Sequence, residues 1–304
     1  MRYFGSEGEI MKKVLFICAL SSISVLAFAG CGAAPAAAVG DTVALDEFDT
    51  LDVEVSSYDL TITVGDSYSI EYNAESGREP KISQSGGKLT ITQPSRTFFN
   101  LFGSTSMPDA YYKITVPEGA SPISLTAKAS SAEVTIDRVD FSGKIKTSSG
   151  DVMLNDIEGN IIEVETGSGK ACADKIRAGA VSFGTSSGDV ELLRIEADDI
   201  SCNTSSGEVG INNSVGKNVM CQTSSGAVDV ELLGSTDGYS YYVDTSSGDI
   251  SVNGQQAKKE YVKDDGPGGK VAVHTSSGDV NITVQEVQTQ ETSRRTDGGA
   301  HVPV

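Results

Sequence analysis

Thr185-Ser186-Ser187-Gly188 is one copy of a four-residue motif that recurs along this chain at an almost constant interval. From Thr147 to Thr223 successive copies begin 19 residues apart, and the copy at Thr166 reads Thr-Gly-Ser-Gly. Strict periodicity of this length is typical of a solenoid, in which each repeat completes the hydrophobic core of its neighbours. The copies begin at Thr147, Thr166, Thr185, Thr204, Thr223, Thr245 and Thr275.

Residues around each copy alternate between apolar and polar. With Thr as position 0, apolar residues recur at −4, −2, +5, +7 and +10, and around Thr185 these are Val181, Phe183, Val190, Leu192 and Ile195. A period of two indicates strands, because successive strand side chains point to opposite faces. We therefore predict an all-β fold, a parallel β-helix of about 19 residues per coil. Right-handed winding is expected from the general chirality of parallel crossovers.

The motif itself is interpreted as a corner of the coil. Thr at position 0 should point inward and form a ladder of hydroxyls that hydrogen-bond between coils. Gly at +3 would permit a positive φ, and the Ser hydroxyls could bond the local backbone. A second corner is marked by a small residue at +12, which is Gly159, Ala178, Ala197 or Gly216. Weaker copies of the pattern predict further coils around residues 129–132, 55–60 and 84–89.

These patterns divide the chain into regions. We expect a β-solenoid over residues 46–285, with irregular coils over 46–125 that act as a cap and regular coils over 126–285. The polar segment Gly254–Gly269 is expected to protrude as a loop, and residues 286–304 are expected to form a disordered tail.

The first part of the chain resembles a targeting signal. Met11-Lys12-Lys13 precedes an apolar run, which leads into Phe28-Ala29-Gly30-Cys31. This resembles a bacterial lipoprotein signal over residues 11–30, with lipid attached at Cys31 and a flexible tether over residues 31–45. The alternative is an ordinary secretory signal in which Cys31 is incidental. Because the codons of Glu7-Gly8-Glu9 can spell a ribosome-binding sequence, residues 1–10 are expected to be an artefactual extension upstream of Met11.

Charge and composition argue against several functions. The formal net charge is −19, which disfavours nucleic acid as a partner and adsorption to anionic lipid. The chain has two His, His274 and His301, and no Gly-x-Ser-x-Gly nucleophile elbow stands between a strand and a helix, so we predict no enzyme and no cofactor. His274 is outward, and we expect no carboxylate partner around it. The acidic column at +4 is interrupted by Lys170 and Ala227, so we interpret it as a solvated stripe and not as a calcium site.

Two cysteines share the inward −2 position of neighbouring coils, Cys202 and Cys221. They could form a disulfide, or they could be two small buried hydrophobic residues. Cys172 falls at the outward position +6 and is expected to be an exposed thiol. The apolar cluster at residues 98–102 is expected to cover an open end of the solenoid, with a binding patch as the alternative.

The Ser-Ser-Gly-Asp-Val corners, the strand Tyr112–Pro117 and the lipoprotein signal resemble the bacterial putative-adhesin family, domain of unknown function 4097, over about residues 45–285. The resemblance implies a β-solenoid on the cell envelope, and it carries over no catalytic or ligand-binding residue. We therefore predict an extracytoplasmic, membrane-anchored lipoprotein that acts as a non-catalytic binding or adhesin-like scaffold for an unknown surface protein or glycan. The alternatives are an envelope-stress sensing or regulatory protein and a degenerate polysaccharide-acting enzyme.

Overall fold

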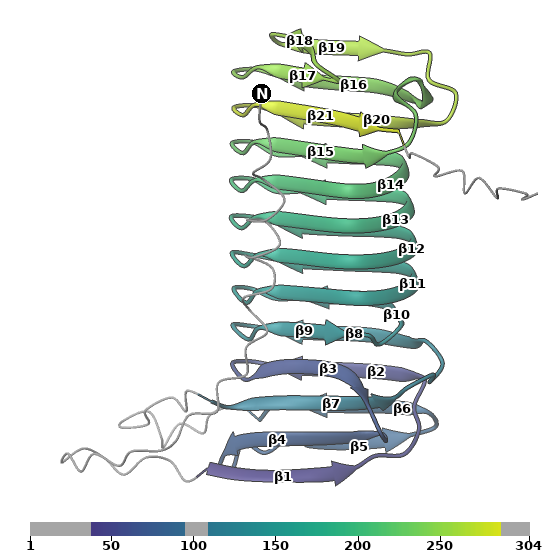
Figure 1. The fold of residues 1–304 in the computed structure, drawn as a ribbon. Helices are drawn as coiled ribbons and strands as arrows, with labels where there is room; N and C mark the ends of the chain where they lie inside the picture. The colour runs from purple at the N-terminus through teal and green to yellow at the C-terminus, as the bar shows by residue number, and fades with distance from the viewer. Residues whose placement is uncertain (1–37, 95–108, 287–304) are drawn as a thin grey trace, which may run out of the picture. The chain divides into compact units, whose positions relative to one another are not determined.

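The computed structural model describes residues 38–94 and 109–286, which form a 21-stranded sheet wound around a central core (Figure 1). A short 3-10 helix, Thr236–Gly238, interrupts it. The strands are β1 (Ala38–Ala44), β2 (Thr50–Val55), β3 (Asp59–Gly65), β4 (Ser69–Glu75), β5 (Lys81–Ser85), β6 (Lys88–Thr92), β7 (Tyr111–Pro117), β8 (Ile123–Ala129), β9 (Val134–Asp137), β10 (Phe141–Lys146), β11 (Val152–Thr166), β12 (Ala171–Thr185), β13 (Val190–Asn203), β14 (Val209–Gln222), β15 (Val228–Leu233), β16 (Tyr239–Thr245), β17 (Ile250–Val252), β18 (Gln255–Ala257), β19 (Glu260–Lys263), β20 (Gly269–Thr275) and β21 (Val280–Gln285).

The regular part of the stack is a parallel β-helix. Strands β11 to β14 pair in parallel, and partners such as Ala173 and Leu192 lie one repeat apart in the sequence. In Figure 1 the strands that follow the Thr-Ser-Ser-Gly corner run from left to right in front, and the chain returns behind them one coil higher. This winding is right-handed. The predicted fold class is therefore confirmed.

The predicted inward positions form the core. None of the five inward apolar residues around Thr185 is more than 2% exposed. Where a polar side chain takes an inward position, as Ser214 does, it makes hydrogen bonds within the stack. Ser214, at +10 of the Thr204 coil, is fully buried; its hydroxyl accepts a hydrogen bond from Ile195 N at 3.0 Å and donates to Asn212 O at 2.8 Å. Burying this hydroxyl is tolerated because both of its bonds are made.

In six of the seven corners the Thr joins neighbouring coils through its hydroxyl. Thr204 Oγ1 accepts from Gly207 N at 3.1 Å and donates to Gly188 O of the coil beneath, also at 3.1 Å. The predicted inter-coil role of the Thr hydroxyls is therefore confirmed. The Thr-to-glycine pairs are Thr166–Gly150, Thr185–Gly169, Thr204–Gly188, Thr223–Gly207, Thr275–Gly226 and Thr245–Gly278.

The prediction that the corner Gly supplies a positive φ is wrong. Positive φ among glycines occurs elsewhere in the described ranges, and Gly188 and Gly207 are not among those positions. A Cβ on Gly207 would instead lie 1.7 Å from Gly188 O. Glycine is needed because stacked corners approach each other too closely for a side chain.

The positive φ lies at position +9 of the coil, on residues other than glycine. Arg138, Asp156, Lys175, Arg194 and Asn213 have φ values of 59°, 53°, 60°, 55° and 50°. This left-handed conformation costs non-glycine residues roughly 1–2 kcal/mol each. Stacking the same bend in successive coils keeps the ladder intact, since Arg138 N still donates to Asn155 O at 2.9 Å.

At the C-terminal end, the coils do not stack in sequence order. Strand β20 lies between β14 and β16, and β21 lies between β15 and β17. The Thr275 coil therefore sits beneath the Thr245 coil. The expectation that Gly254–Gly269 protrudes as a loop is wrong, because β18 and β19 pair antiparallel with β17 and β16 along the top edge. Asn253 and Gly254, with φ of 48° and 81°, make the tight turn between β17 and β18.

The N-terminal end has a comparable arrangement. The coil of β2 and β3 lies between the β6–β7 coil and the β8–β9 coil. Strand β4 pairs antiparallel with β7, and β1 pairs antiparallel with β4, so these strands terminate the parallel stack. Two expectations are corrected here. Residues 38–44 form β1 and do not belong to a flexible tether, and residues 84–89 form the turn of the antiparallel β5–β6 hairpin, where Gly86 and Gly87 have φ of 60° and 79°.

The coil of β2 and β3 has no Ser-Ser-Gly corner beneath it, and the side chain of Gln93 takes that place. In regular coils the corner amides bond a carbonyl of the coil below, as when Ser186 N and Ser187 N donate to Gly167 O at 3.1 Å. Gln93 Oε1 accepts from Ser56 N at 2.6 Å and from Ser57 N at 3.1 Å. A side-chain amide thus substitutes for the missing backbone carbonyl.

Several predictions fall outside the described residues. These are the extension over residues 1–10, the signal over residues 11–30, the lipid attachment at Cys31, the apolar cluster at residues 98–102 and the tail beyond residue 286. They stay predictions.

Candidate binding surface

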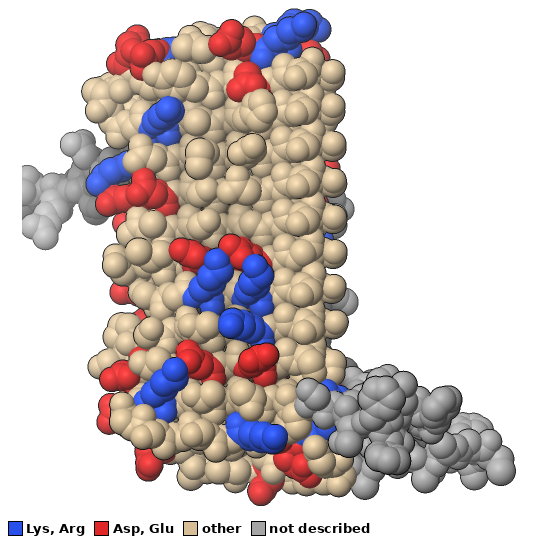
Figure 2. All heavy atoms as spheres, turned by 180° about the vertical axis from the view of Figure 1, so that it is seen from behind, with Lys and Arg blue, Asp and Glu red and all other residues tan. Residues whose placement is uncertain are grey.

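One broad face of the stack combines charged side chains, an uncharged band and a hollow. We call it the pre-corner face: the outward side chains at −5, −3 and −1 of the strands that lead into each Thr corner or its equivalent. These strands are β6, β2, β8, β10, the ends of β11–β14, β20 and β16. Figure 2 shows this face with the corner column along its right edge. Charged side chains gather in its lower part, and an uncharged band lies above them.

The charged group in the lower part is internally paired. Lys144 Nζ lies 3.3 Å from Glu163 Oε2 and 2.7 Å from Glu165 Oε1, and Lys146 Nζ lies 3.0 Å from Glu165 Oε2. Hydrogen bonds from Lys144 and then Lys146 lower the pKa of Glu165. The hydrogen bond to Glu165 in turn raises the pKa of Lys144. These lysines are therefore partly neutralised by their own neighbours.

The uncharged band is made of the residues at −3 and −1 before three successive corners, those of Thr185, Thr204 and Thr223. Its members are small or amide-bearing side chains, apart from Met220, which is 52% exposed. Such a surface offers hydrogen-bond donors and acceptors on a regular, flat strand lattice. The band consists of Ser182, Gly184, Ser201, Asn203, Met220 and Gln222.

A hollow of about 380 Å³ opens on this face between β8, β10 and β11. It lies where the coil from Ala129 to Thr147 is one residue shorter than the regular repeat. The missing residue belongs to the second corner, so the chain retracts there and Phe141 becomes fully buried. The lining residues are Ser124, Leu125, Thr126, Ser142, Gly143, Lys144, Asn160, Ile161 and Glu163.

In this shortened segment, position 143 has room only for glycine. Its φ is 151°, and a Cβ there would lie 1.9 Å from Leu125 O. The adjacent Ser142 hydroxyl accepts a hydrogen bond from Asn160 N at 2.8 Å, which fixes the floor of the hollow. Ile161 stands at the rim with 49% of its surface exposed. The hollow thus combines hydroxyl, amide and apolar groups.

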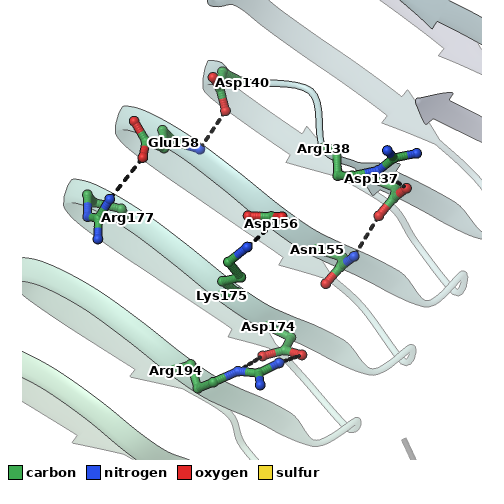
Figure 3. A network of polar contacts seen from close by, with 10 residues as sticks. All are labelled: Asp137, Arg138, Asp140, Asn155, Asp156, Glu158, Asp174, Lys175, Arg177 and Arg194. Atoms are coloured by element: carbon green, nitrogen blue, oxygen red, sulfur yellow. Dashed lines mark hydrogen bonds and ion pairs between the residues drawn. The ribbon is translucent and has the colours of Figure 1, made fainter. Parts of the chain in front are cut away.

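The second corner carries a ladder of charged side chains on the outside of the stack (Figure 3). Lys175 Nζ lies 2.7 Å from Asp156 Oδ2, and Arg194 Nε donates to Asp174 Oδ1 at 2.8 Å. Arg177 bridges Glu158 and Glu196 of the coils on either side, at 3.0 Å to each. Opposite charges pair between coils, so we assign this ladder a structural role.

The acidic column at +4 also links coils. Asp151 Oδ1 accepts from Lys170 N at 2.8 Å, and Asp189 Oδ1 accepts from Glu208 N at 3.1 Å. The Glu208 amide is the largest cause of the lowered pKa of Asp189. These carboxylates bond backbone amides of the next coil, a role that the sequence analysis did not assign to them. Among the residues that the structure describes, no group of three or more His, Cys, Asp or Glu is arranged to hold a metal ion.

The cysteines are protected from reaction. Cys202 and Cys221 are adjacent partners of β13 and β14, both buried and both free thiols. Their mutual hydrogen bond and burial raise the pKa of Cys202. Cys172 was expected to be exposed, but its side chain is partly buried. That burial, followed by the Glu191 carboxylate, raises its pKa to about 12.

The expectation that His274 lacks a carboxylate partner is wrong. His274 Nδ1 lies 2.6 Å from Asp244 Oδ2, because β16 and β20 are neighbours and both residues occupy position −1. The sequence could have predicted this contact, because Asp244 and His274 both stand directly before a Thr-Ser-Ser-Gly corner. Close by, Lys270 Nζ lies 4.4 Å from the ring centre of Tyr242, whose hydroxyl donates to Asp264.

The described ranges contain no helix that is long and apolar enough to cross a bilayer. A family model described as Toastrack DUF4097 matches residues 48–283. No curated protein matches the chain.

Several solved structures are similar. A putative adhesin from Bacteroides fragilis shares 11% identity, with a TM-score of 0.48, over 83% of this chain and 97% of its own. A putative lipid binding protein from Parabacteroides distasonis shares 17% identity, with a TM-score of 0.46, over 84% and 98%. A putative cell adhesion protein from Clostridium sporogenes shares 16% identity, with a TM-score of 0.30, over 82% and 100%.

Proposed function

This chain belongs to the Toastrack DUF4097 family, and we propose that it is a non-catalytic, adhesin-like binding scaffold of the cell envelope. In this proposal the pre-corner face is its docking surface. The observation that supports it is the combination of a flat uncharged band with a hollow on one continuous strand face. Stacked solenoid coils present extended surfaces of this kind to large partners.

The state of the chemically active side chains supports a non-catalytic role. General acid or base catalysis needs a group that is free to exchange protons near a bound substrate. Here Asp156, Asp174 and Glu158 are ion-paired between coils. The raised pKa of Cys172 keeps its thiol protonated and so a poor nucleophile at neutral pH. These groups hold the scaffold together.

The proposed location follows from the sequence. A lipid on Cys31 would hold the mature chain on the outer side of a membrane, since burying each methylene contributes about 0.8 kcal/mol.

Site-specific photocrosslinking on intact cells tests the docking face. A photoreactive amino acid at Ser201 lies in the uncharged band, and the matched control at Glu191 points outward on the opposite face of the stack, before the same strand bends at the second corner. We expect an envelope component to be captured from Ser201 and not from Glu191. Equal capture from both positions would refute a dedicated face. Capture of a membrane signalling protein would instead favour the stress-sensing alternative.

A further inference from the structure

We propose that the hollow between β8, β10 and β11 is a subsite for one sugar residue of an uncharged polysaccharide. This inference rests on the proposed binding function and names the class of partner. The hollow's volume of about 380 Å³ falls at the lower end of the roughly 300–1,000 Å³ range of ligand pockets. That size suits a small ring better than a large ligand.

The lining matches the chemistry of a sugar. Hydroxyl groups of Ser124, Thr126 and Ser142 and the amide of Asn160 surround the space, and each can both donate and accept. The exposed side of Ile161 supplies an apolar contact at the rim. A sugar ring carries the complementary set, with hydroxyls around its edge and C–H groups on its faces.

Charge selects against acidic polymers. The one cation that lines the hollow, Lys144, is paired with Glu163 and Glu165, and Glu163 itself faces the space. The chain as a whole carries a formal charge of −19, so an anionic glycan would be repelled over the approach. An uncharged polysaccharide incurs no such penalty.

The geometry of the sheet also disfavours an extended peptide at this place. A peptide that adds to a sheet needs a free edge with unpaired backbone groups. The hollow instead lies on the face of the sheet, where β10 is paired on one side with β8 and on the other with β11. A ligand here therefore has no strand edge to extend and must bind mainly through the lining side chains, as a hydroxyl-rich polymer can.

The rest of the pre-corner face can continue the contact. Above the hollow, the uncharged band presents Ser182, then Ser201 and Asn203, then Gln222 at the strand spacing of about 4.8 Å. A polymer anchored in the hollow would meet successive hydroxyl and amide groups as it runs along the stack.

Affinity electrophoresis of the purified protein tests this assignment. The gels contain neutral polysaccharides (dextran, mannan, galactomannan and mixed-linkage β-glucan) or acidic ones (alginate and polygalacturonate). We expect at least one neutral polymer to retard the protein. Ser124→Phe, which fills the hollow from an exposed strand position, should weaken that retardation about tenfold or more. The matched control is Asn281→Phe, exposed on the opposite face.

Ile161→Ala provides a second variant, and Val215→Ala is its control, since both residues are exposed at the second corner, at 49% and 43%. We expect weaker binding from Ile161→Ala alone, with unchanged melting temperature for both. Retardation by acidic polymers only, by none, or equally in a folded Ser124→Phe variant would overturn the sugar subsite. If Ser201 still captures a partner on cells in that case, the docking face stands and only the ligand class is wrong. If both experiments are negative, both proposals fall.

Discussion

Replacing Gly207 by Ala tests why the corner needs glycine. Two physical explanations predict opposite signs. Gly207 has no positive φ, so if backbone freedom were the only issue, Ala would stabilise the protein by about 0.4–1 kcal/mol through the unfolded state. If close stacking decides, Ala must destabilise it.

The structure gives the size of the second effect. The new Cβ would lie 1.7 Å from Gly188 O and 2.5 Å from Gly188 C, whereas real Cβ atoms keep at least 3.0 Å. The two corners must therefore separate by more than about 1 Å, which lengthens the hydrogen bond from Thr204 Oγ1 to Gly188 O beyond its present 3.1 Å. Losing one or two such bonds at about 0.5–1.5 kcal/mol each, together with about 1–3 kcal/mol of overpacking, gives a loss of about 2–5 kcal/mol.

Urea unfolding followed by circular dichroism measures the change. The matched control is Gly210→Ala in the same coil, where a Cβ would meet nothing closer than Asn212 Nδ2 at 3.7 Å. We expect a clearly lower midpoint for Gly207→Ala and an unchanged or slightly higher midpoint for Gly210→Ala. A midpoint for Gly207→Ala equal to or above that of the unmodified protein would refute the stacking explanation.

Three further predictions concern the cap, the anchor and the pH dependence. Gln93→Leu removes the acceptor of the Ser56 and Ser57 amides, so urea unfolding should show a loss of about 2–3 kcal/mol; no loss would contradict the capping role. Cys31→Ser should move the protein from the membrane fraction to the soluble fraction on cell fractionation, and persistence in the membrane would contradict lipid attachment. The lowered pKa of Glu165 means that its contribution is present above its ordinary pKa of 4.5 and is lost as pH falls through the lower folded-state value. Glu165→Gln should therefore lower the melting temperature at pH 7. Below pH 4.5 the melting temperature of this variant should fall less with decreasing pH than that of the unmodified protein, and an equal fall in both would contradict this.

The sequence was sufficient for the coil because two independent signals agree in it. The 19-residue step fixes which residues stack, and the alternation from −4 to +7 fixes which of them point inward. A one-residue slip would expose the apolar column of Val181, Phe183 and their equivalents. No alternative register buries the same set, so the frame could be predicted without any structure.

The local causes were harder to predict. Gly at +3 is compatible with either a positive φ or a close approach, and only the 1.7 Å clash at Gly207 distinguishes them. The left-handed bend at +9 had no consistent sequence signal. Asn213 is of a type that favours this conformation, but Lys175 and Arg194 at the same position are not. Tertiary stacking imposes the bend, and the pairing of Arg194 with Asp174 helps to hold it.

The order of the terminal coils could not be read from spacing. Residues between Thr245 and Thr275 are too many for a regular coil, and a surplus of this kind predicts a loop equally well. The structure uses the surplus to return β20 beneath β16 and to lay β19 antiparallel along the top. An antiparallel end strand breaks the repeating edge that another parallel coil would extend, and this limits end-to-end association of the stack.

The irregular step is more informative about binding than the repeated motif. In regular coils, the Thr hydroxyl and the corner backbone groups are consumed by contacts within the stack, as in the bonds that join Thr204, Gly207 and Gly188. A perfect repeat therefore leaves a uniform surface. The hollow forms where the step from Ala129 to Thr147 lacks one residue, and Gly143 is part of its lining. A departure from the period changes the outer surface while the inward columns stay in register, and such departures are where a solenoid can acquire specificity without losing its core.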